Sequence, residues 1–200
     1  MSFTNAFVLS YKNINEFDRR YSLLTRDFGK IEAVVKSILK SNSKLAGHLE
    51  PPSLCWVELI ERGNSFQLTQ ALEQKNFSKL KKNQGALSLV LKLSDFINGF
   101  VGKDTDDEFF SIWDSFLDYL ESHLIPGEIL DFEFLEVQTE LRFLKQLGFL
   151  PEVSDRDLDA RFFDEYKIIL GGNILAKSVF SEEIKKIALR FKDQAASYMA

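Results

Sequence analysis

The residue types that most often carry enzyme chemistry are scarce and widely separated in this sequence. His48 and His123 are its two histidines, and Cys55 is its single cysteine. These residues cannot supply the nitrogen and sulfur ligands of a zinc site. No Gly-x-Ser-x-Gly turn is present to expose a serine nucleophile. Cys55 lies in an apolar run, which is typical of a packed thiol. We therefore expect neither catalysis nor a metal or other cofactor.

The basic residues indicate a different chemistry, the binding of phosphate groups. Lysine and arginine neutralise nucleic-acid phosphates and release their counterions. Lys and Arg are frequent between positions 12 and 44, and three further lysines, Lys79, Lys81 and Lys82, follow later. The candidate nucleic-acid-binding residues are Lys12, Arg19, Arg26, Lys30, Lys36, Lys40 and Lys44. We expect those from Arg19 to Lys44 to form one continuous positive surface. Because carboxylates such as Glu16 and Glu32 are interleaved, a merely solvated charged surface is the alternative.

Charge divides the chain into two unequal parts. Residues 1–82 hold 13 Lys and Arg against 8 Asp and Glu, a net charge of +5, whereas the remainder holds 12 against 22, a net charge of −10. Such an asymmetry predicts that a polyanionic partner meets the first part. The chain has no apolar run long enough for a membrane span and no secretion signal at Met1–Asn5. We therefore expect a cytoplasmic protein with no membrane partner.

The first part has the pattern of short β-strands. Alternating or apolar runs separated by turn residues predict five strands, at 5–12, 19–26, 30–36, 54–61 and 66–72. Asp27-Phe28-Gly29 predicts a tight turn with positive φ at Gly29. A long link that ends at Pro51-Pro52 separates the third strand from the fourth. This arrangement predicts an OB-type β-barrel over residues 1–78, with an SH3-like barrel as the competing assignment.

Residues 79–200 have helical spacing instead, so the predicted fold class is α+β, a five-stranded barrel followed by an all-α domain. One helical stretch is expected over 79–100 and a second helix after Asp106-Asp107, where the carboxylates serve as caps. A third helix carries Leu130 to Leu144 and stops at Gly148, and a last one starts at Ser181. Trp56 and Trp113 each fall in an apolar run and are expected in the core.

The order of residues in the first part resembles the opening of the bacterial recombination mediator RecO. The matching segments, in order, are Glu16-Phe17-Asp18-Arg19, Leu23-Leu24-Thr25-Arg26-Asp27-Phe28-Gly29-Lys30-Ile31, Val34-Val35-Lys36, Ser43-Lys44-Leu45-Ala46-Gly47-His48-Leu49-Glu50-Pro51 and Val57-Glu58-Leu59. A weaker echo follows in Thr139-Glu140-Leu141-Arg142-Phe143-Leu144 and Leu147-Gly148-Phe149-Leu150-Pro151.

This resemblance implies an N-terminal OB domain, a helical C-terminal domain and a function without bond chemistry. Proteins of the family bind single- and double-stranded DNA and anneal complementary strands. With the ring-forming partner RecR they help to load the recombinase RecA onto strands coated with single-stranded-DNA-binding protein. They engage the acidic, apolar C-terminal tail of that protein through the helical domain, and here Arg142 is the candidate residue for this contact. A DNA-repair protein of the bacterial cytoplasm, associated with the nucleoid, is expected.

The sequence departs from the family in two places. Where many relatives have a Lys-Gly-Ala-Arg type stretch after the third strand, this chain has Lys36-Ser37-Ile38-Leu39-Lys40, which carries less charge. The cysteine zinc module that some relatives carry in the helical domain is absent, as in a short member of the family. Two other functions therefore stay open: a protein-interaction adaptor with little DNA affinity, and an RNA-binding OB protein.

Overall fold

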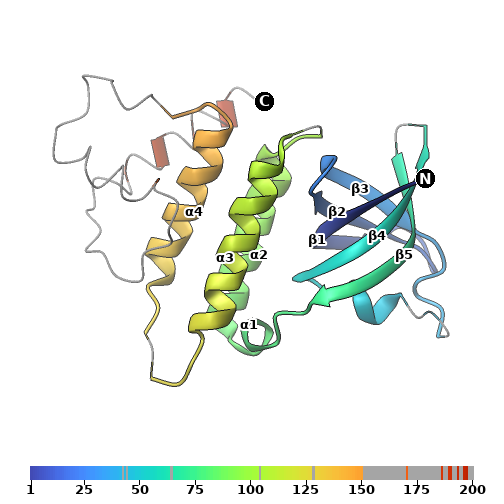
Figure 1. The fold of residues 1–200 in the computed structure, drawn as a ribbon, viewed down its shortest axis with the longest axis horizontal. Helices are drawn as coiled ribbons and strands as arrows, with labels where there is room; N and C mark the ends of the chain where they lie inside the picture. The colour runs from blue at the N-terminus through green and yellow to red at the C-terminus, as the bar shows by residue number, and fades with distance from the viewer. Residues whose placement is uncertain are drawn as a thin grey trace.

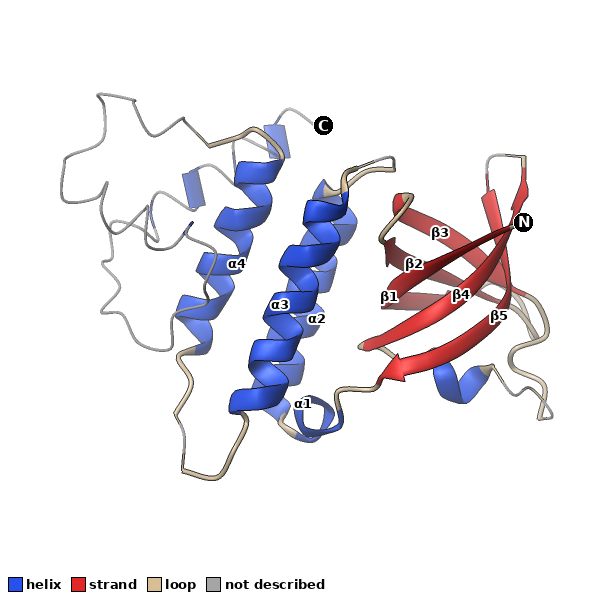
Figure 2. Ribbon diagram, in the orientation of Figure 1, coloured by secondary structure: helices blue, strands red, loops and turns tan. Residues whose placement is uncertain are grey.

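The computed structural model places a β-barrel at the N-terminus and helices beside it (Figures 1 and 2). It describes residues 1–150 except Asn42, Lys44, Asn64, Asp104 and Glu128, and beyond them only Leu170, Lys186, Leu189, Arg190, Asp193, Ala196 and Ser197. The strands are β1 (Ser2–Asn13), β2 (Arg19–Thr25), β3 (Gly29–Val35), β4 (Ser53–Arg62) and β5 (Ser65–Lys75), with a 3-10 turn at Ala46–His48. The α-helices with described bounds are α1 (Ser78–Lys82), α2 (Gln84–Phe100), α3 (Asp107–His123) and α4 (Phe132–Gln146).

The five strands close into a barrel in the order β1-β2-β3-β5-β4. Neighbouring strands are antiparallel except β3 and β5, which pair in parallel over Ala33–Phe66 and Val34–Gln67 alone. This strand order is that of an OB-type Greek-key barrel rather than an SH3-like one. The predicted fold class, a five-stranded OB-type barrel followed by helices, is confirmed.

The turn between β2 and β3 forms as the sequence predicts. Gly29 has φ 61°, in the left-handed region that suits glycine. A Cβ atom at this position would lie 2.7 Å from the backbone nitrogen of Thr105. The Thr25 hydroxyl donates to the Gly29 carbonyl (2.8 Å) and accepts from the Phe28 amide (3.0 Å). Glycine is therefore required both by backbone conformation and by the approach of the segment after α2.

The helical part differs from the prediction at two helix starts. The stretch expected as one helix over 79–100 is divided at Asn83, whose extended backbone ends α1 and whose side-chain oxygen accepts from the Ala86 amide to begin α2. Asp106 stands at the start of α3 but makes no capping bond there. Its carboxylate instead accepts from the Gln146 side chain of α4 (2.7 Å), so this residue links two helices. The helix predicted from Ser181 lies almost entirely outside the described residues.

Two hydrophobic cores share the barrel wall between them. One fills the barrel and includes Val8, Leu23 and Ile31. The other joins the outer side of the wall, at residues such as Phe7 and Leu54, to the helices. The barrel and the helices that follow position 78 are therefore joined by a shared hydrophobic core.

The two tryptophans have different environments. Trp113 of α3 is 1% exposed, as predicted for a core residue. The same prediction is wrong in part for Trp56, which is only half-buried on the outer side of β4. There it stacks on Phe3, with ring centroids 4.8 Å apart.

Candidate nucleic-acid interface

A polar groove crosses the outer face of β1, β2 and β3. It has a volume of about 190 Å³. Its lining residues are Ser10, Tyr11, Lys12, Arg20, Ser22, Lys30, Glu32 and Asn98. We call this feature the barrel groove. Three of the eight residues are cations and one is a carboxylate, so the groove is suited to an anionic ligand.

Strand pairing explains why these residues meet. Lys12 of β1 lies opposite Arg20 of β2, and Ser22 lies opposite both Ser10 of β1 and Glu32 of β3. Because side chains alternate between the two faces of a strand, Arg20 and Ser22 point outward while their neighbours point into the barrel. The Arg20 guanidinium lies 3.5 Å from the Glu32 carboxylate, with both side chains substantially exposed. Such a solvated pair contributes little to stability.

Asn98, near the end of α2, fixes the floor of the barrel groove. The Ser22 hydroxyl donates to its side-chain oxygen, and its amide nitrogen donates to the Ser10 hydroxyl (3.1 Å). Lys30 Nζ donates to the Asn98 backbone carbonyl (2.7 Å), and burial lowers the pKa of this lysine below its usual range. The helical part of the chain thus positions a cation of the barrel.

A second hollow lies where β3 and β5 meet, and we call it the seam pocket. Its volume is about 530 Å³. Its lining residues are Val34, Lys36, Arg62, Ser65, Phe66 and Gln67. Lys30, Glu32, Val34 and Lys36 occupy alternate positions along and just beyond β3, so one row of side chains runs from the barrel groove to the seam pocket. The two hollows form one surface with five cations.

The structure separates the sequence-predicted cations into those on this surface and those elsewhere. Lys12 and Lys30 line the barrel groove, and Lys36 lines the seam pocket. Arg19 begins β2, Arg26 follows its last residue, and neither lines either hollow; the continuous surface expected from Arg19 to Lys44 stays a prediction.

The cations outside the two hollows have intramolecular contacts or are not described. Arg19 stands 4.0 Å from the Tyr11 ring centre and 3.4 Å from the Glu50 carboxylate, and its side chain is only 15% exposed. Arg26 lies over the ring of Phe110 of α3. Lys40 Nζ lies 5.3 Å from the centre of the Phe17 ring. Lys44 lies outside the described residues.

Sequence reasoning missed Arg20 and Arg62. The signal for Arg20 was present, because Tyr21 and Leu23 are apolar and set the inward phase of β2, which makes Arg20 and Ser22 the outward pair. For Arg62 the sequence shows only a turn residue. Its place beside Lys36 depends on the closure between β3 and β5, which joins segments about 30 residues apart in the chain.

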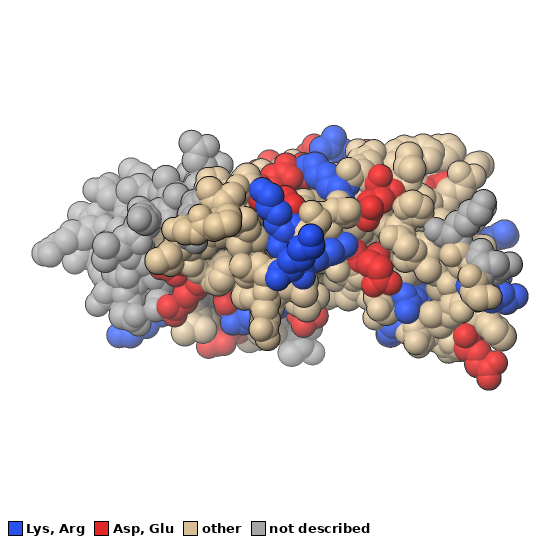
Figure 3. All heavy atoms as spheres, turned by 90° about the horizontal axis from the view of Figure 1, so that it is seen from below, with Lys and Arg blue, Asp and Glu red and all other residues tan. Residues whose placement is uncertain are grey.

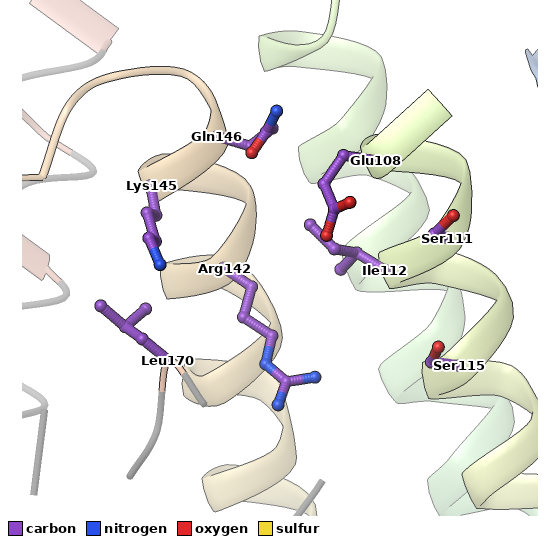
Figure 4. A pocket seen from close by; sticks show the side chains of 8 residues that line it. All are labelled: Glu108, Ser111, Ile112, Ser115, Arg142, Lys145, Gln146 and Leu170. Carbon is purple, nitrogen blue, oxygen red and sulfur yellow. The ribbon is translucent and has the colours of Figure 1, made fainter. Parts of the chain in front are cut away.

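A separate cavity lies between α3 and α4 and contains Arg142 (Figure 4). Its volume is about 150 Å³. Its lining residues are Glu108, Ser111, Ile112, Ser115, Arg142, Lys145, Gln146 and Leu170. Arg142 extends from α4 toward α3, and burial lowers the pKa of its guanidinium. We call this the helical cavity. It combines two cations and one carboxylate, Glu108, with the apolar side chains of Ile112 and Leu170.

The remaining candidate residues have structural roles in the part of the chain that the structure describes. The Cys55 thiol is buried and donates to the His48 carbonyl (3.0 Å). His123 Nδ1 lies 2.9 Å from the Tyr119 carbonyl. Within the described residues, no cluster of three or more His, Cys, Asp or Glu is suited to a metal ion. None of the described helices is long and apolar enough to cross a bilayer.

Comparison with known proteins shows where this barrel occurs. Residues 1–76 match the family model "Recombination protein O N terminal". Proteins named "DNA repair protein RecO" match over a longer stretch: that of Caldanaerobacter subterraneus is 26% identical over 149 residues, and that of Heliobacterium modesticaldum is 27% identical over 149 residues. Each alignment covers 74% of this chain and so extends from the barrel into the helices.

Residues 1–76 are a RecO N-terminal domain, and the similarity to RecO proteins continues into the helices. A third member, from Myxococcus xanthus, is 28% identical over 150 residues. The alignments cover 58% of the Caldanaerobacter protein and 52% of the Heliobacterium protein, so the chain spans little more than half the length of these RecO relatives. The matched family domain is the OB barrel that carries the barrel groove and the seam pocket.

Proposed function

We propose that this RecO-family chain binds DNA across the barrel groove and the seam pocket and acts as a recombination mediator in DNA repair. The observation that carries the proposal is the gathering of Lys12, Arg20, Lys30, Lys36 and Arg62 on one face of a RecO-type OB barrel. The outer faces of strands two and three are where OB folds bind oligonucleotides. Recognition is electrostatic and involves no bond chemistry.

Contacts on this surface are mainly to phosphates. Lysine, arginine and serine side chains line it, and these groups bind phosphate oxygens without reading bases. Binding of both single and double strands follows from this, as does an ability to bring complementary strands together, since neutralised phosphates repel one another less. The proposed site of action is the nucleoid in the bacterial cytoplasm.

The experiment that tests this proposal is DNA binding by the full chain with Lys12→Glu and Arg20→Glu combined. We expect affinity for labelled single-stranded DNA to fall at least tenfold at about 0.1 M salt, because two phosphate contacts become repulsions. A matched control is Lys186→Glu with Arg190→Glu, which changes net charge equally at two exposed helical residues. Loss of affinity in both variants, or in neither, would contradict the proposal.

The proposed protein partners are a RecR-like ring protein and the C-terminal tail of single-stranded-DNA-binding protein. The helical cavity supports the second of these, because Arg142 and Lys145 beside Ile112 and Leu170 would complement a segment that is both acidic and apolar. In this arrangement the barrel holds the strand while the helices hold the protein that coated it.

A protein-interaction adaptor with little DNA affinity is the second candidate function. One observation favours it: Phe3 is 48% exposed and Leu72 is 60% exposed, both on the outer side of the barrel near Trp56. Exposed apolar side chains in one area are typical of protein interfaces. Absence of measurable DNA binding by a folded parent chain, at low and physiological salt, would favour the adaptor.

A further inference from the structure

Helix α1, which joins the barrel to the other helices, carries three lysines within five residues. We propose that Lys79, Lys81 and Lys82 form a second phosphate-binding segment that engages the part of a DNA strand extending beyond the barrel surface. Seen from the side on which α1 lies, Lys and Arg side chains gather in the middle of the molecule (Figure 3). We call these three residues the α1 lysine patch. Its role rests on the proposed DNA binding by the barrel and extends it.

The backbone that carries the α1 lysine patch is firmly held. Phe77 and Leu80 are buried in the core shared by the barrel and the helices. The Glu121 carboxylate of α3 accepts from the backbone amides of Lys79 (3.1 Å) and Leu80 (3.0 Å). The lysine side chains therefore project from a fixed base, so ordering them on a ligand costs less than it would on a loose loop.

Nearby carboxylates are occupied by other partners. Glu121 binds the two backbone amides, whereas Asp114 and Asp118 bind Lys75 Nζ at 2.8 and 2.7 Å. Lys81 Nζ donates to the Glu50 backbone carbonyl (3.0 Å), while the Glu50 carboxylate faces Arg19. Within the described residues, none of the three patch lysines has a carboxylate oxygen within 4.0 Å of its ammonium nitrogen. The patch thus offers positive charge to an external anion.

The distance between the α1 lysine patch and the barrel groove is set by one helix. Asn83 begins α2, and Asn98 near the other end of α2 lines the barrel groove. At 1.5 Å per residue the two positions are roughly 20 Å apart along the axis. This exceeds the Debye length of about 8 Å at physiological salt, so charges in the patch have little effect on an anion in the groove. Only a DNA strand long enough to reach both the α1 lysine patch and the barrel groove would interact with both.

The exposed surface of α1 favours nucleic acid over a membrane. Its one apolar residue, Leu80, faces the core, and its exposed residues are Ser78, Lys79 and Lys82. Helices that bind a bilayer surface insert an apolar face between the lipids, and α1 has no such face to offer. Binding of a phosphate backbone requires charge alone.

The test compares DNA lengths in the full chain with Lys79→Glu and Lys82→Glu combined, since these two lysines are exposed. We expect at least a fivefold loss of affinity for a single strand of about 40 nucleotides, and a log–log salt slope about 1.4 units shallower, from roughly 0.7 per lost contact. Affinity for a strand of about 6 nucleotides, near the lower end of OB-fold site sizes, is expected to stay within twofold. Lys186→Glu with Arg190→Glu is the charge-matched control and should leave both lengths unaffected.

Each other outcome overturns the proposal in a recognisable way. Equal losses on both lengths would show a long-range charge effect rather than a second contact. If the Lys79→Glu/Lys82→Glu variant binds the long strand as the parent does, while the Lys12→Glu/Arg20→Glu variant binds it more weakly, the α1 lysine patch does not bind DNA. The proposal for the barrel surface would then still hold. A parent that binds neither length would refute the proposed function and the patch together. If Lys79→Glu and Lys82→Glu abolish binding to phosphatidylserine vesicles but leave DNA affinity unchanged, the α1 lysine patch binds lipid instead.

Discussion

The ring centroids of Phe7 on β1 and Phe110 on α3 lie 4.7 Å apart, and this contact joins the barrel wall to the helices. Phe7 points away from the barrel interior, and Phe110 also lies under the guanidinium of Arg26. One side of the barrel wall is therefore as buried as its interior. The proposed nucleic-acid face lies on the part of the wall that the helices leave open.

Removing this aromatic contact should destabilise the whole chain. We expect Phe7→Ala or Phe110→Ala to lower the free energy of unfolding by about 3–5 kcal/mol, because each ring is fully buried. Urea unfolding followed by circular dichroism measures this change. Leu72→Ala, at an exposed position on β5, should stay within about 0.5 kcal/mol. A barrel that retains its stability without the Phe110 ring would contradict the shared core.

Two adjacent arginines on β2 provide a matched pair of variants. Arg20→Gln should weaken binding to single-stranded DNA several-fold with little loss of stability, since its guanidinium lies in the barrel groove. Arg19→Gln should leave DNA affinity within about twofold while lowering stability by up to about 1 kcal/mol, through lost contacts to Tyr11 and Glu50. Fluorescence anisotropy and thermal unfolding measure the two effects. The reverse pattern would place the interface on the other side of the strand.

The seam pocket should contribute phosphate contacts of its own. Lys36→Glu combined with Arg62→Glu is expected to weaken single-strand binding about tenfold and to flatten the log–log salt slope by about 1.4 units. For a parent chain with four to six contacts that slope is roughly −3 to −4. Lys40→Glu, outside both hollows, serves as the comparison and should have the smaller effect. A parent slope near zero would contradict electrostatic binding.

Cys55 should be unreactive in the folded chain. Burial raises the pKa of its thiol from 9.0 to about 11, because a thiolate at this position would lose its hydration. The stability that comes from keeping this thiol neutral is present below pH 9 and is lost as the pH rises toward 11. Labelling with a chromogenic disulfide at pH 8 should be slow in the native protein and rapid in urea. Fast native labelling would show that the strand around Cys55 opens readily.

Arg142 gives a test of the helical cavity. Arg142→Ala is expected to weaken binding of a peptide with the acidic, apolar tail sequence of single-stranded-DNA-binding protein at least fivefold, with DNA affinity unchanged. Calorimetric titration measures the peptide affinity. Because Arg142 is only 9% exposed, Lys145→Ala at the exposed rim is the companion variant, and it should show a smaller loss in the same direction. Equal peptide affinity in the parent and both variants would exclude the cavity as the binding site.

The elements of this fold could be predicted because local patterns decide them. Period-two alternation and the turn at Gly29 place the strands, and apolar spacing places α3 and α4. The division at Asn83 could not be predicted, because the sequence does not show whether the side chain of an asparagine in a helical run will cap a new helix. For Trp56 the apolar run predicts burial, but the sequence does not show which face of the strand another layer covers.

The charge of the proposed binding surface could be predicted from the sequence, but the residues that line it could not. The basic character of the barrel is a property of composition. Asn98, which holds Lys30 and orders two serines of the groove, lies 68 residues from that lysine in sequence and carries no signal of its own. Strand phase distinguishes Arg20 from Arg19, because the apolar residues Tyr21 and Leu23 specify which side of β2 faces the barrel interior.

The joint between β3 and β5 has a mechanical consequence. This joint is a parallel match of two residue pairs, whereas every other joint of the barrel is a long antiparallel ladder. Parting it would cost the hydrogen bonds of those pairs, on the order of 1–3 kcal/mol, and part of the burial of Phe66, while the remaining ladders stay intact. This joint is therefore the one that we expect to open first, and it lies beside Lys36 and Arg62. Under the proposed function, a phosphate bound by both cations would hold the two strand ends together.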